Sequence, residues 1–159
     1  MDYASATPAD SAGSWDQFWY GNTWAVPTNV TYNGMIVRKG TSGATTTGLP
    51  FSATTDGLAN TMMVSEKRLN PKLYQAGDWD DDQGWIDGWD PDVVRYTGYQ
   101  PARDDSSKSG YEFGSAHVAG VNALFGDGSV RMIRYSVDAA LFNNLGHRAD
   151  GQSINLGGL

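Results

Sequence analysis

A short turn between two apolar runs is the feature that most constrains the fold of this chain. Val121–Phe125 and Ser129–Tyr135 are rich in strand-forming residues, and Gly126, Asp127 and Gly128 separate them. Asp-Gly between two such runs is a strong signal of a β-hairpin, because glycine adopts positive φ freely and aspartate tolerates it. Asp127 and Gly128 therefore have a sufficient structural explanation, and the sequence predicts an antiparallel pair of strands here.

The composition favours strands and turns over long helices. The 159 residues include 20 Gly with many Thr, Ser, Asn and Asp, and six Trp, eight Tyr and five Phe supply large contact areas. Such a mixture is typical of short strands joined by loops. We therefore expect one α+β domain with a mainly antiparallel sheet and one or two short helices. The chain has no Cys, which excludes disulfides and thiolate metal sites within it.

Local patterns predict the remaining elements. We expect strands over residues 24–26, 30–38, 61–66 and 93–99, and a helix over 137–145 with Ser136 as its N-cap and Gly146 as its C-terminal stop. Asp56, Gly57 and Asn60 are expected to form a structural turn before the strand at 61–66. Residues 1–23 indicate a loose N-terminal arm that docks through its aromatic rings, so the globular domain is expected to span residues 24–159.

The negative charge is concentrated in one segment. Seven Asp and no Lys or Arg lie between residues 78 and 92, whereas the rest of the chain has 11 acidic and 11 basic residues. Binding to nucleic acid needs a basic surface, and so does an amphipathic membrane helix. The sequence shows neither of them, and it has no apolar run long enough to cross a bilayer.

Three segments resemble a known family, in the same order along the chain. Residues 55–66 read Thr-Asp-Gly-Leu-Ala-Asn-Thr-Met-Met-Val-Ser-Glu, and residues 84–95 combine Trp and Asp ahead of an Arg-containing strand. His117 is followed by nine residues and then by Asp127 and Gly128. Together they resemble the prepilin-type processing-associated family (domain of unknown function 1559), which is named for a His, nine residues and Asp-Gly.

The resemblance implies a protein similar to the pseudopilins of type II secretion. It implies a pilin-like C-terminal globular domain, located in the periplasm or at the cell surface of a planctomycete-type bacterium. Pilin-like subunits or secretion machinery would be its partners. The 159 residues contain no counterpart of the N-terminal leader and long apolar helix of the family, so we expect membrane anchoring only through a helix upstream of Met1.

His117 has two interpretations, a metal ligand or general base and a side chain that holds its loop to the hairpin. A metal site needs three or four ligands, and the chain has only one other histidine, which favours the structural interpretation. Ser115, His117 and Asp127 include the residue types of a hydrolytic triad, but no nucleophile-elbow pattern surrounds Ser115. Glu66 and Glu112 show no spacing that places them across a cleft. The sequence therefore predicts no catalysed reaction.

The acidic segment is the better candidate for a binding site. Asp78, Asp80 and Asp82 alternate as in calcium-binding loops, and oxygen ligands suit a hard cation. The EF-hand pattern fails, because its Gly and Glu positions hold other residues. One hypothesis is a Ca²⁺ site of another kind drawn from Asp78, Asp80, Asp82 and Asp87, as the calcium site of major pseudopilins suggests. The other hypothesis is a solvated acidic loop.

Three tryptophans lie in or beside the same segment. Trp79, Trp85 and Trp89 form either an exposed platform that stacks on sugar rings or a cover that packs on the sheet and stiffens the loop. Two functions therefore stay open. The first is a non-catalytic, pseudopilin-like structural or assembly protein, and the second is a secreted module that binds calcium, a glycan or both through residues 78–92.

Overall fold

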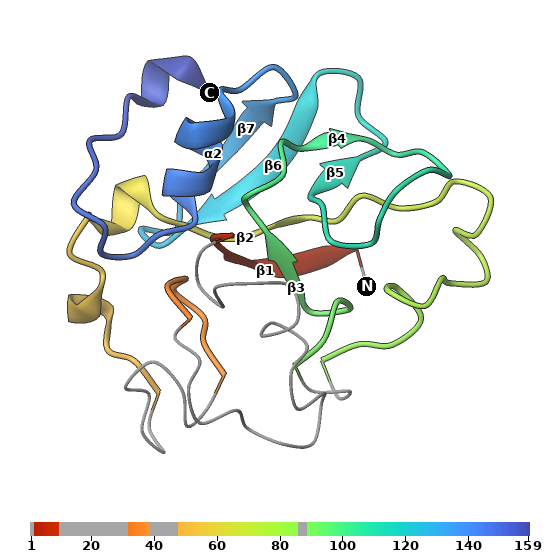
Figure 1. Ribbon diagram of the computed structural model, residues 1–159, viewed down its shortest axis with the longest axis horizontal. Coiled ribbons are helices and arrows are strands. Elements are labelled where there is room, and N and C mark those ends of the chain that lie inside the picture. The colour runs from red at the N-terminus through yellow and green to blue at the C-terminus, as the bar shows by residue number, and fades with distance from the viewer. Residues whose placement is uncertain (1, 10–31, 39–47, 86–88) are drawn as a thin grey trace.

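The computed structural model describes residues 2–9, 32–38, 48–85 and 89–159. In this part of the chain a five-stranded sheet has the order β3-β1-β2-β6-β7, and β4 and β5 form a second, two-stranded sheet (Figure 1). The strands are β1 (Tyr3–Thr7), β2 (Met62–Glu66), β3 (Val94–Tyr96), β4 (Ala102–Arg103), β5 (Gly114–Ser115), β6 (Gly120–Phe125) and β7 (Val130–Arg134). The helical elements are α2 (Ala139–Leu145) and the 3₁₀ turns η1 (Phe51–Ala53), η2 (Leu58–Asn60) and η3 (Leu156–Gly158). A sheet-dominated α+β fold is confirmed.

The predicted hairpin is present as β6 and β7. The two strands pair antiparallel from Gly120 opposite Arg134 to Leu124 opposite Val130. Phe125 O accepts the N–H of Gly128 at 3.0 Å, and Gly128 has a φ of +84°. A three-residue loop whose last residue is a left-handed glycine is a common hairpin connection. The Asp-Gly signal thus identified the hairpin correctly.

The main core lies between the large sheet and α2. It contains buried apolar residues from β1, β2, β6, β7, α2 and the segments just before β5 and α2, namely Ala4, Ala6, Met62, Phe113, Val121, Ala123, Phe125, Ile133, Val137, Phe142 and Leu145. The rings of Phe113 and Phe142 meet edge to face at 6.1 Å, which joins the helix to the segment before β6. A second, smaller cluster on the β3 side contains Tyr32, Val94 and Tyr96.

The helix begins two residues later than predicted and ends at the predicted residue, Leu145. Its N-cap is Asp138, whose side chain accepts the N–H of Leu141 at 2.9 Å, so the assignment of Ser136 as cap was wrong. Gly146 does end the helix, but with a φ of −75° rather than a left-handed one. A Cβ on Gly146 would lie 2.2 Å from Thr97 Oγ1, so close packing against Thr97 explains this glycine.

The N-terminal residues hold the largest correction. Tyr3–Thr7 is not part of a loose arm: it forms β1, which pairs antiparallel with β2 and parallel with β3. Its residues 4–7 are fully buried. Residues 10–23, with the predicted aromatic group, and the predicted strand at 24–26 lie outside the described residues. The predicted strand at 30–38 is wrong for residues 32–38, which form bends without strand pairing.

The described residues include no helix that is long and apolar enough to span a membrane.

Candidate functional site

One strand, β6, separates the two parts of the family motif. His117 lies in the loop before β6, and Asp127 and Gly128 lie in the turn after it. Because β6 has six residues at about 3.3 Å each, the two parts of the motif are about 20 Å apart. His117 and Asp127 therefore do not act on the same atom, and a Ser115–His117–Asp127 triad does not form.

At the first end of β6, the motif binds to the last residue of β2. The carboxylate of Glu66 accepts the backbone N–H of Asn122 at 2.7 Å through Oε2, and its Oε1 lies 3.1 Å from His117 Nε2. The Asn122 side chain is also 3.3 Å from His117 Nε2. The His117 ring is 58% exposed, whereas the Glu66 side chain is 12% exposed. His117 therefore covers one side of a mostly buried carboxylate.

Side chains hold the backbone of the loop that carries His117. The His117 N–H donates to Ser115 Oγ at 3.1 Å, and Tyr135 Oη donates to His117 O at 2.9 Å. The Ser115 hydroxyl donates to Gly120 O at 2.9 Å. Ser115 is thus engaged with main-chain groups, and the His117 ring is directed to Glu66 instead of to the serine hydroxyl, so the pair lacks the arrangement of an activated nucleophile.

At the other end of β6, the turn rests on the chain just before β2. Gly126 N donates to Thr61 O at 3.0 Å, and Asp127 N donates to Leu58 O at 3.2 Å. Within the turn, the Ser129 hydroxyl and N–H donate to Asp127 Oδ1 and hold the pKa of Asp127 below its usual value. The contacts at one end of β6 involve Glu66, His117 and Asn122, and those at the other end involve Leu58, Thr61 and Asp127. We call these two sets of contacts the β2–β6 clasp.

The turn at residues 56–60 connects the clasp to the C-terminal residues. Asp56 accepts the N–H of Asp150 at 2.6 Å and that of Gly151 at 2.9 Å through its two carboxylate oxygens. Asn60 Nδ2 donates to Asp56 O at 2.9 Å, and Gly57 has a φ of +97°, which glycine adopts without strain. The conformation of this turn thus positions an acceptor for a segment more than 90 residues away.

The acidic segment is an internal countercharge for buried cations. Asp80 is fully buried, and its Oδ2 lies 3.0 Å from Arg95 Nη1 of β3. Arg95 Nη2 also donates to Asp80 O at 2.7 Å. Lys108 contacts Asp80 Oδ1 and lies 3.2 Å from Asp78 Oδ2. The side chains of Arg95 and Lys108 are 0% and 3% exposed, so both cations depend on these aspartates for solvation.

A third buried cation, Lys67, follows β2 and completes the cluster. Lys67 Nζ lies 2.5 Å from Asp81 Oδ1 and donates to Asp92 O at 3.2 Å. Burial lowers the pKa of Lys67 and raises the pKa of Asp92, because it disfavours the charged form of each. Burial also lowers the pKa of Arg95. The segment that the sequence presents as a run of unpaired carboxylates is therefore matched by Lys67, Arg95 and Lys108.

This pairing bears directly on the calcium hypothesis. Asp78 and Asp80 point to the same lysine, Asp82 is exposed, and Asp87 lies outside the described residues. No group of three or more His, Asp or Glu that could hold a metal ion occurs among the residues that the structure describes. Sequence reasoning missed these cations because Lys67 and Lys108 lie outside the acidic segment. Only Arg95, in the strand that follows residue 92, stands close to the aspartates in the sequence.

The three tryptophans do not share one environment. Trp79 is 53% exposed and packs edge to face on Tyr111 with ring centroids 5.6 Å apart. Trp85 is 52% exposed. Trp89 instead packs on Tyr32 of the smaller core cluster at 4.9 Å. A platform of all three rings is therefore not available, although Trp79 and Trp85 are accessible.

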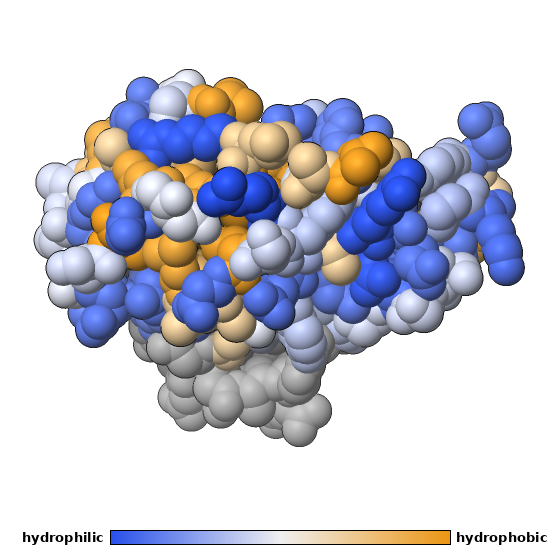
Figure 2. Space-filling model, turned by 90° about the horizontal axis from the view of Figure 1, so that it is seen from above, coloured by the Kyte–Doolittle hydropathy of each residue, from blue (hydrophilic) through white to orange (hydrophobic). Residues whose placement is uncertain are grey.

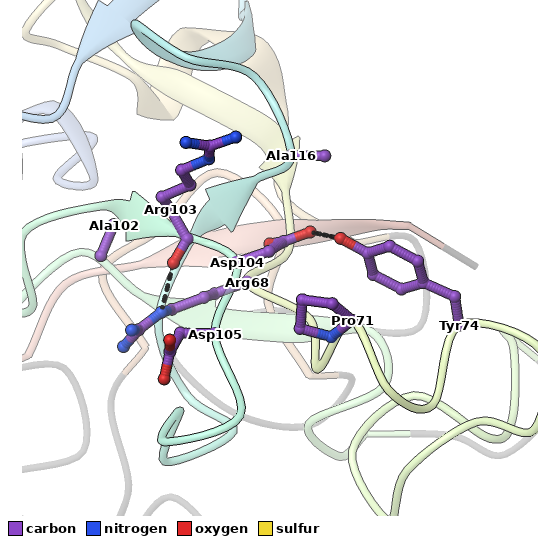
Figure 3. Close-up of a pocket in the computed structure, with 8 residues that line it drawn as sticks. All are labelled: Arg68, Pro71, Tyr74, Ala102, Arg103, Asp104, Asp105 and Ala116. Atoms are coloured by element: carbon purple, nitrogen blue, oxygen red, sulfur yellow. Dashed lines mark hydrogen bonds between the residues drawn. The ribbon is translucent and has the colours of Figure 1, made fainter.

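Two hollows adjoin β4 and β5 and share part of their walls. The larger has a volume of about 650 Å³ and is lined by Arg68, Pro71, Tyr74, Ala102, Arg103, Asp104, Asp105 and Ala116 (Figure 3). The smaller, of about 280 Å³, includes Glu66, Lys67 and His117 and shares Tyr74, Asp104 and Ala116. In Figure 3 the Tyr74 hydroxyl donates to Asp104, at 2.5 Å, and the Arg68 side chain donates to Arg103 O, at 2.9 Å. These polar groups are directed at one another rather than into the open hollow.

A model of one protein family matches residues 2–140, which include every strand and the start of α2. Its description is "Protein of unknown function (DUF1559)". The chain belongs to this family. The DUF1559 match covers the turn at 56–60, the acidic segment and the β6–β7 hairpin. No curated protein matches the chain, and no solved structure does.

Proposed function

We propose that this chain is a non-catalytic, pseudopilin-like domain that works outside the cytoplasm as a structural or assembly protein. One observation carries the proposal: the segments that mark the family hold strands to one another instead of converging on a reactive centre. Glu66 binds His117 and Asn122 at one end of β6, and Leu58 binds Asp127 in the turn at the other end. The residues of the acidic segment compensate buried cations.

The same pattern supports a scaffold role over catalysis. A catalytic site brings a nucleophile, a base and an electrophilic group within a few ångströms of one reacting atom. Here Ser115 donates to a backbone carbonyl, His117 is directed to Glu66, and Asp127 is at the far end of β6. Residues used in this way stabilise a fold, and stability is what a displayed subunit needs.

Reading the coding sequence upstream of Met1 tests the proposal. We expect an open reading frame that encodes a prepilin leader and about 20 apolar residues, enough to span a bilayer. In-frame stop codons immediately upstream would contradict it. A protein test goes with it: protease added to intact cells should degrade this chain and spare a cytoplasmic marker, whereas protection until lysis would place it inside the cell.

A glycan-binding module is the second candidate function, and the exposure of Trp79 and Trp85 favours it. Exposed indole rings stack on the apolar faces of sugars. A glycan array, followed by fluorescence titration of any positive oligosaccharide, tests this function. Binding that disappears in Trp79→Ala and Trp85→Ala and persists in Trp89→Phe would support it, and an array without positives would reject it.

A further inference from the structure

The two edge strands of the large sheet differ in whether another segment of the described chain pairs with their outer side. The β3 edge is covered, because Tyr96 N donates to Tyr111 O at 3.0 Å and Tyr96 forms a parallel bridge with Glu112. The β7 edge has β6 on one side and no strand on the other within the described chain. Natural sheets usually protect an edge with Pro, Lys, a bulge or a covering loop, because its free N–H and C=O groups pair with other strands.

The hydrogen-bond pattern shows which groups of β7 face outward. Phe125 N donates to Ser129 O at one end of the hairpin, and Tyr135 N donates to Ala119 O at the other. Since bonded residues alternate along an antiparallel pair, the odd-numbered residues of β7 bond to β6 and the even-numbered ones face away. No other segment of the described chain hydrogen-bonds to the outward groups of Val130 or Met132.

The same residues expose apolar side chains. Val130 is 66% exposed and Met132 is 53% exposed. Seen from above, apolar residues gather on the half of the molecule that carries α2 and β7 in Figure 1 (Figure 2). The strand contains neither Pro nor Lys and pairs with β6 without a bulge, and its charged residues are Arg131 and Arg134. An open backbone edge flanked by exposed apolar side chains is a surface that accepts another strand.

We propose that β7 is an interface for a second copy of this chain, which pairs with it antiparallel across a two-fold axis at Met132. This register places Met132 against the partner's Met132 and Val130 against the partner's Arg134. It is the register that places all three outward residues, Val130, Met132 and Arg134, in hydrogen-bonded positions. Shifting the axis by one residue in either direction leaves one of the three without such a position. The carbonyl of Arg134 also accepts the N–H of Val137 at 3.1 Å, so Val130 and Met132 supply the groups without another bond.

Charge supports the same register. An axis at Arg131 would place this arginine against the partner's Arg131, and like charges directly opposite are destabilising. With the axis at Met132, no two arginines face each other, and Arg134 lies at the end of β7 that adjoins the partner's Asp127 turn. Arg134 therefore lies towards an acidic residue, the partner's Asp127, whose carboxylate is also 3.6 Å from its own Arg131. A two-fold interface of this kind is self-complementary, as most homodimers are.

The interface is small, because it consists of one short strand from each copy. Stable complexes commonly bury about 1,600 Å² in total, so we expect a weaker dimer with a dissociation constant of about 10 to 100 µM. Sedimentation velocity of the purified chain should show a single species whose apparent mass rises from monomer to dimer over that range. A monomer at every concentration up to about 1 mM would overturn the proposal.

A matched pair of variants locates the contact. Met132→Lys places a charge at the centre of the interface and should weaken dimerisation about tenfold or more. Val118→Lys makes the same change in charge at a residue that is 82% exposed and lies outside β7, and it should dimerise like the unchanged chain. Both variants must keep the melting temperature of the parent. A dimer unaffected by Met132→Lys would overturn the proposal.

A cysteine variant tests the register. Because the chain has no Cys, Met132→Cys introduces a single thiol. Hydrogen-bonded antiparallel pairs have Cα atoms about 5.5 Å apart, which is within the reach of a disulfide. Mild oxidation should yield a covalent dimer of Met132→Cys and little of Val118→Cys. Equal cross-linking of both would contradict the register. These results are independent of the cell-surface role, which the upstream sequence and protease access decide.

Discussion

Replacing Asp80 with Asn tests whether the acidic segment stabilises the fold from inside. The change keeps the shape of a fully buried side chain and removes the negative charge shared by Arg95 and Lys108, whose side chains are 0% and 3% exposed. Breaking a buried ion pair by removing one partner costs about 3–5 kcal/mol, because the remaining charge is left without compensation. The Asn side-chain oxygen still accepts one hydrogen bond, so we expect a loss of about 3 kcal/mol in the free energy of unfolding.

A loss of this size leaves the variant folded in the absence of denaturant, so its unfolding can still be measured. Domains of this kind have free energies of unfolding of about 5–15 kcal/mol. Urea unfolding followed by Trp fluorescence gives the midpoint and slope from which the difference is calculated. Asp82→Asn is the matched control, because Asp82 belongs to the same acidic segment and is exposed, and it should change the free energy of unfolding by less than about 0.5 kcal/mol.

Calcium separates this explanation from the metal-site hypothesis. A ligand that binds the folded state raises the melting temperature, whereas an internal ion pair is indifferent to it. We expect millimolar Ca²⁺ to leave the melting temperature of the unchanged chain where it is. The reasoning would be refuted by equal and small effects of Asp80→Asn and Asp82→Asn. It would also be refuted by stabilisation with Ca²⁺ that Asp80→Asn abolishes.

Three further predictions follow from other contacts. Glu66→Gln should lower the free energy of unfolding by about 1–2 kcal/mol, because it weakens the acceptor of Asn122 N in the clasp. His117→Ala should lower it by less, because the His117 ring is 58% exposed. A larger loss in His117→Ala than in Glu66→Gln would contradict this prediction. Gly146→Ala should cost about 1–3 kcal/mol by overpacking against Thr97, whereas Gly157→Ala, whose Cβ would meet only the Asn155 side chain at 3.2 Å, should cost less in the same urea assay. Partial burial and the hydrogen bond to Asp104 raise the pKa of Tyr74 to about 12. Burial also raises the pKa of Tyr32, Tyr96, Tyr99 and Tyr135, so an ultraviolet titration of Tyr74→Phe should lack one of several late tyrosinates of the unchanged chain, the one that forms near pH 12. Because the pKa of Tyr74 is higher in the folded state than in the unfolded state, the contribution of Tyr74 to stability is present below about pH 10 and is lost as the pH rises towards 12.

Local sequence determined the elements whose stabilising contacts lie within a few residues. The β6–β7 hairpin follows from apolar runs around Asp127 and Gly128, and the turn before β2 follows from Asp56 and Gly57. The strand at 62–66 and the short helix that ends at Gly146 also have local causes: strand-forming side chains in one, a four-residue apolar repeat in the other. These features could be predicted because turn geometry and side-chain periodicity act over short distances along the chain.

Tertiary structure decided the position of β1 and the role of the acidic segment. Tyr-Ala-Ser-Ala-Thr has few strand-forming side chains, and it becomes a central strand only because β2 and β3 supply partners about 60 and 90 residues away. The aspartates at 78–92 likewise look unpaired until the sheet brings Lys67 and Arg95 beside them. Backbone pairing and charge compensation both depend on residues that are distant in sequence. The turn at Asp127 and Gly128 could therefore be predicted from its own sequence, whereas the role of Asp80 depends on the residues that the fold places around it.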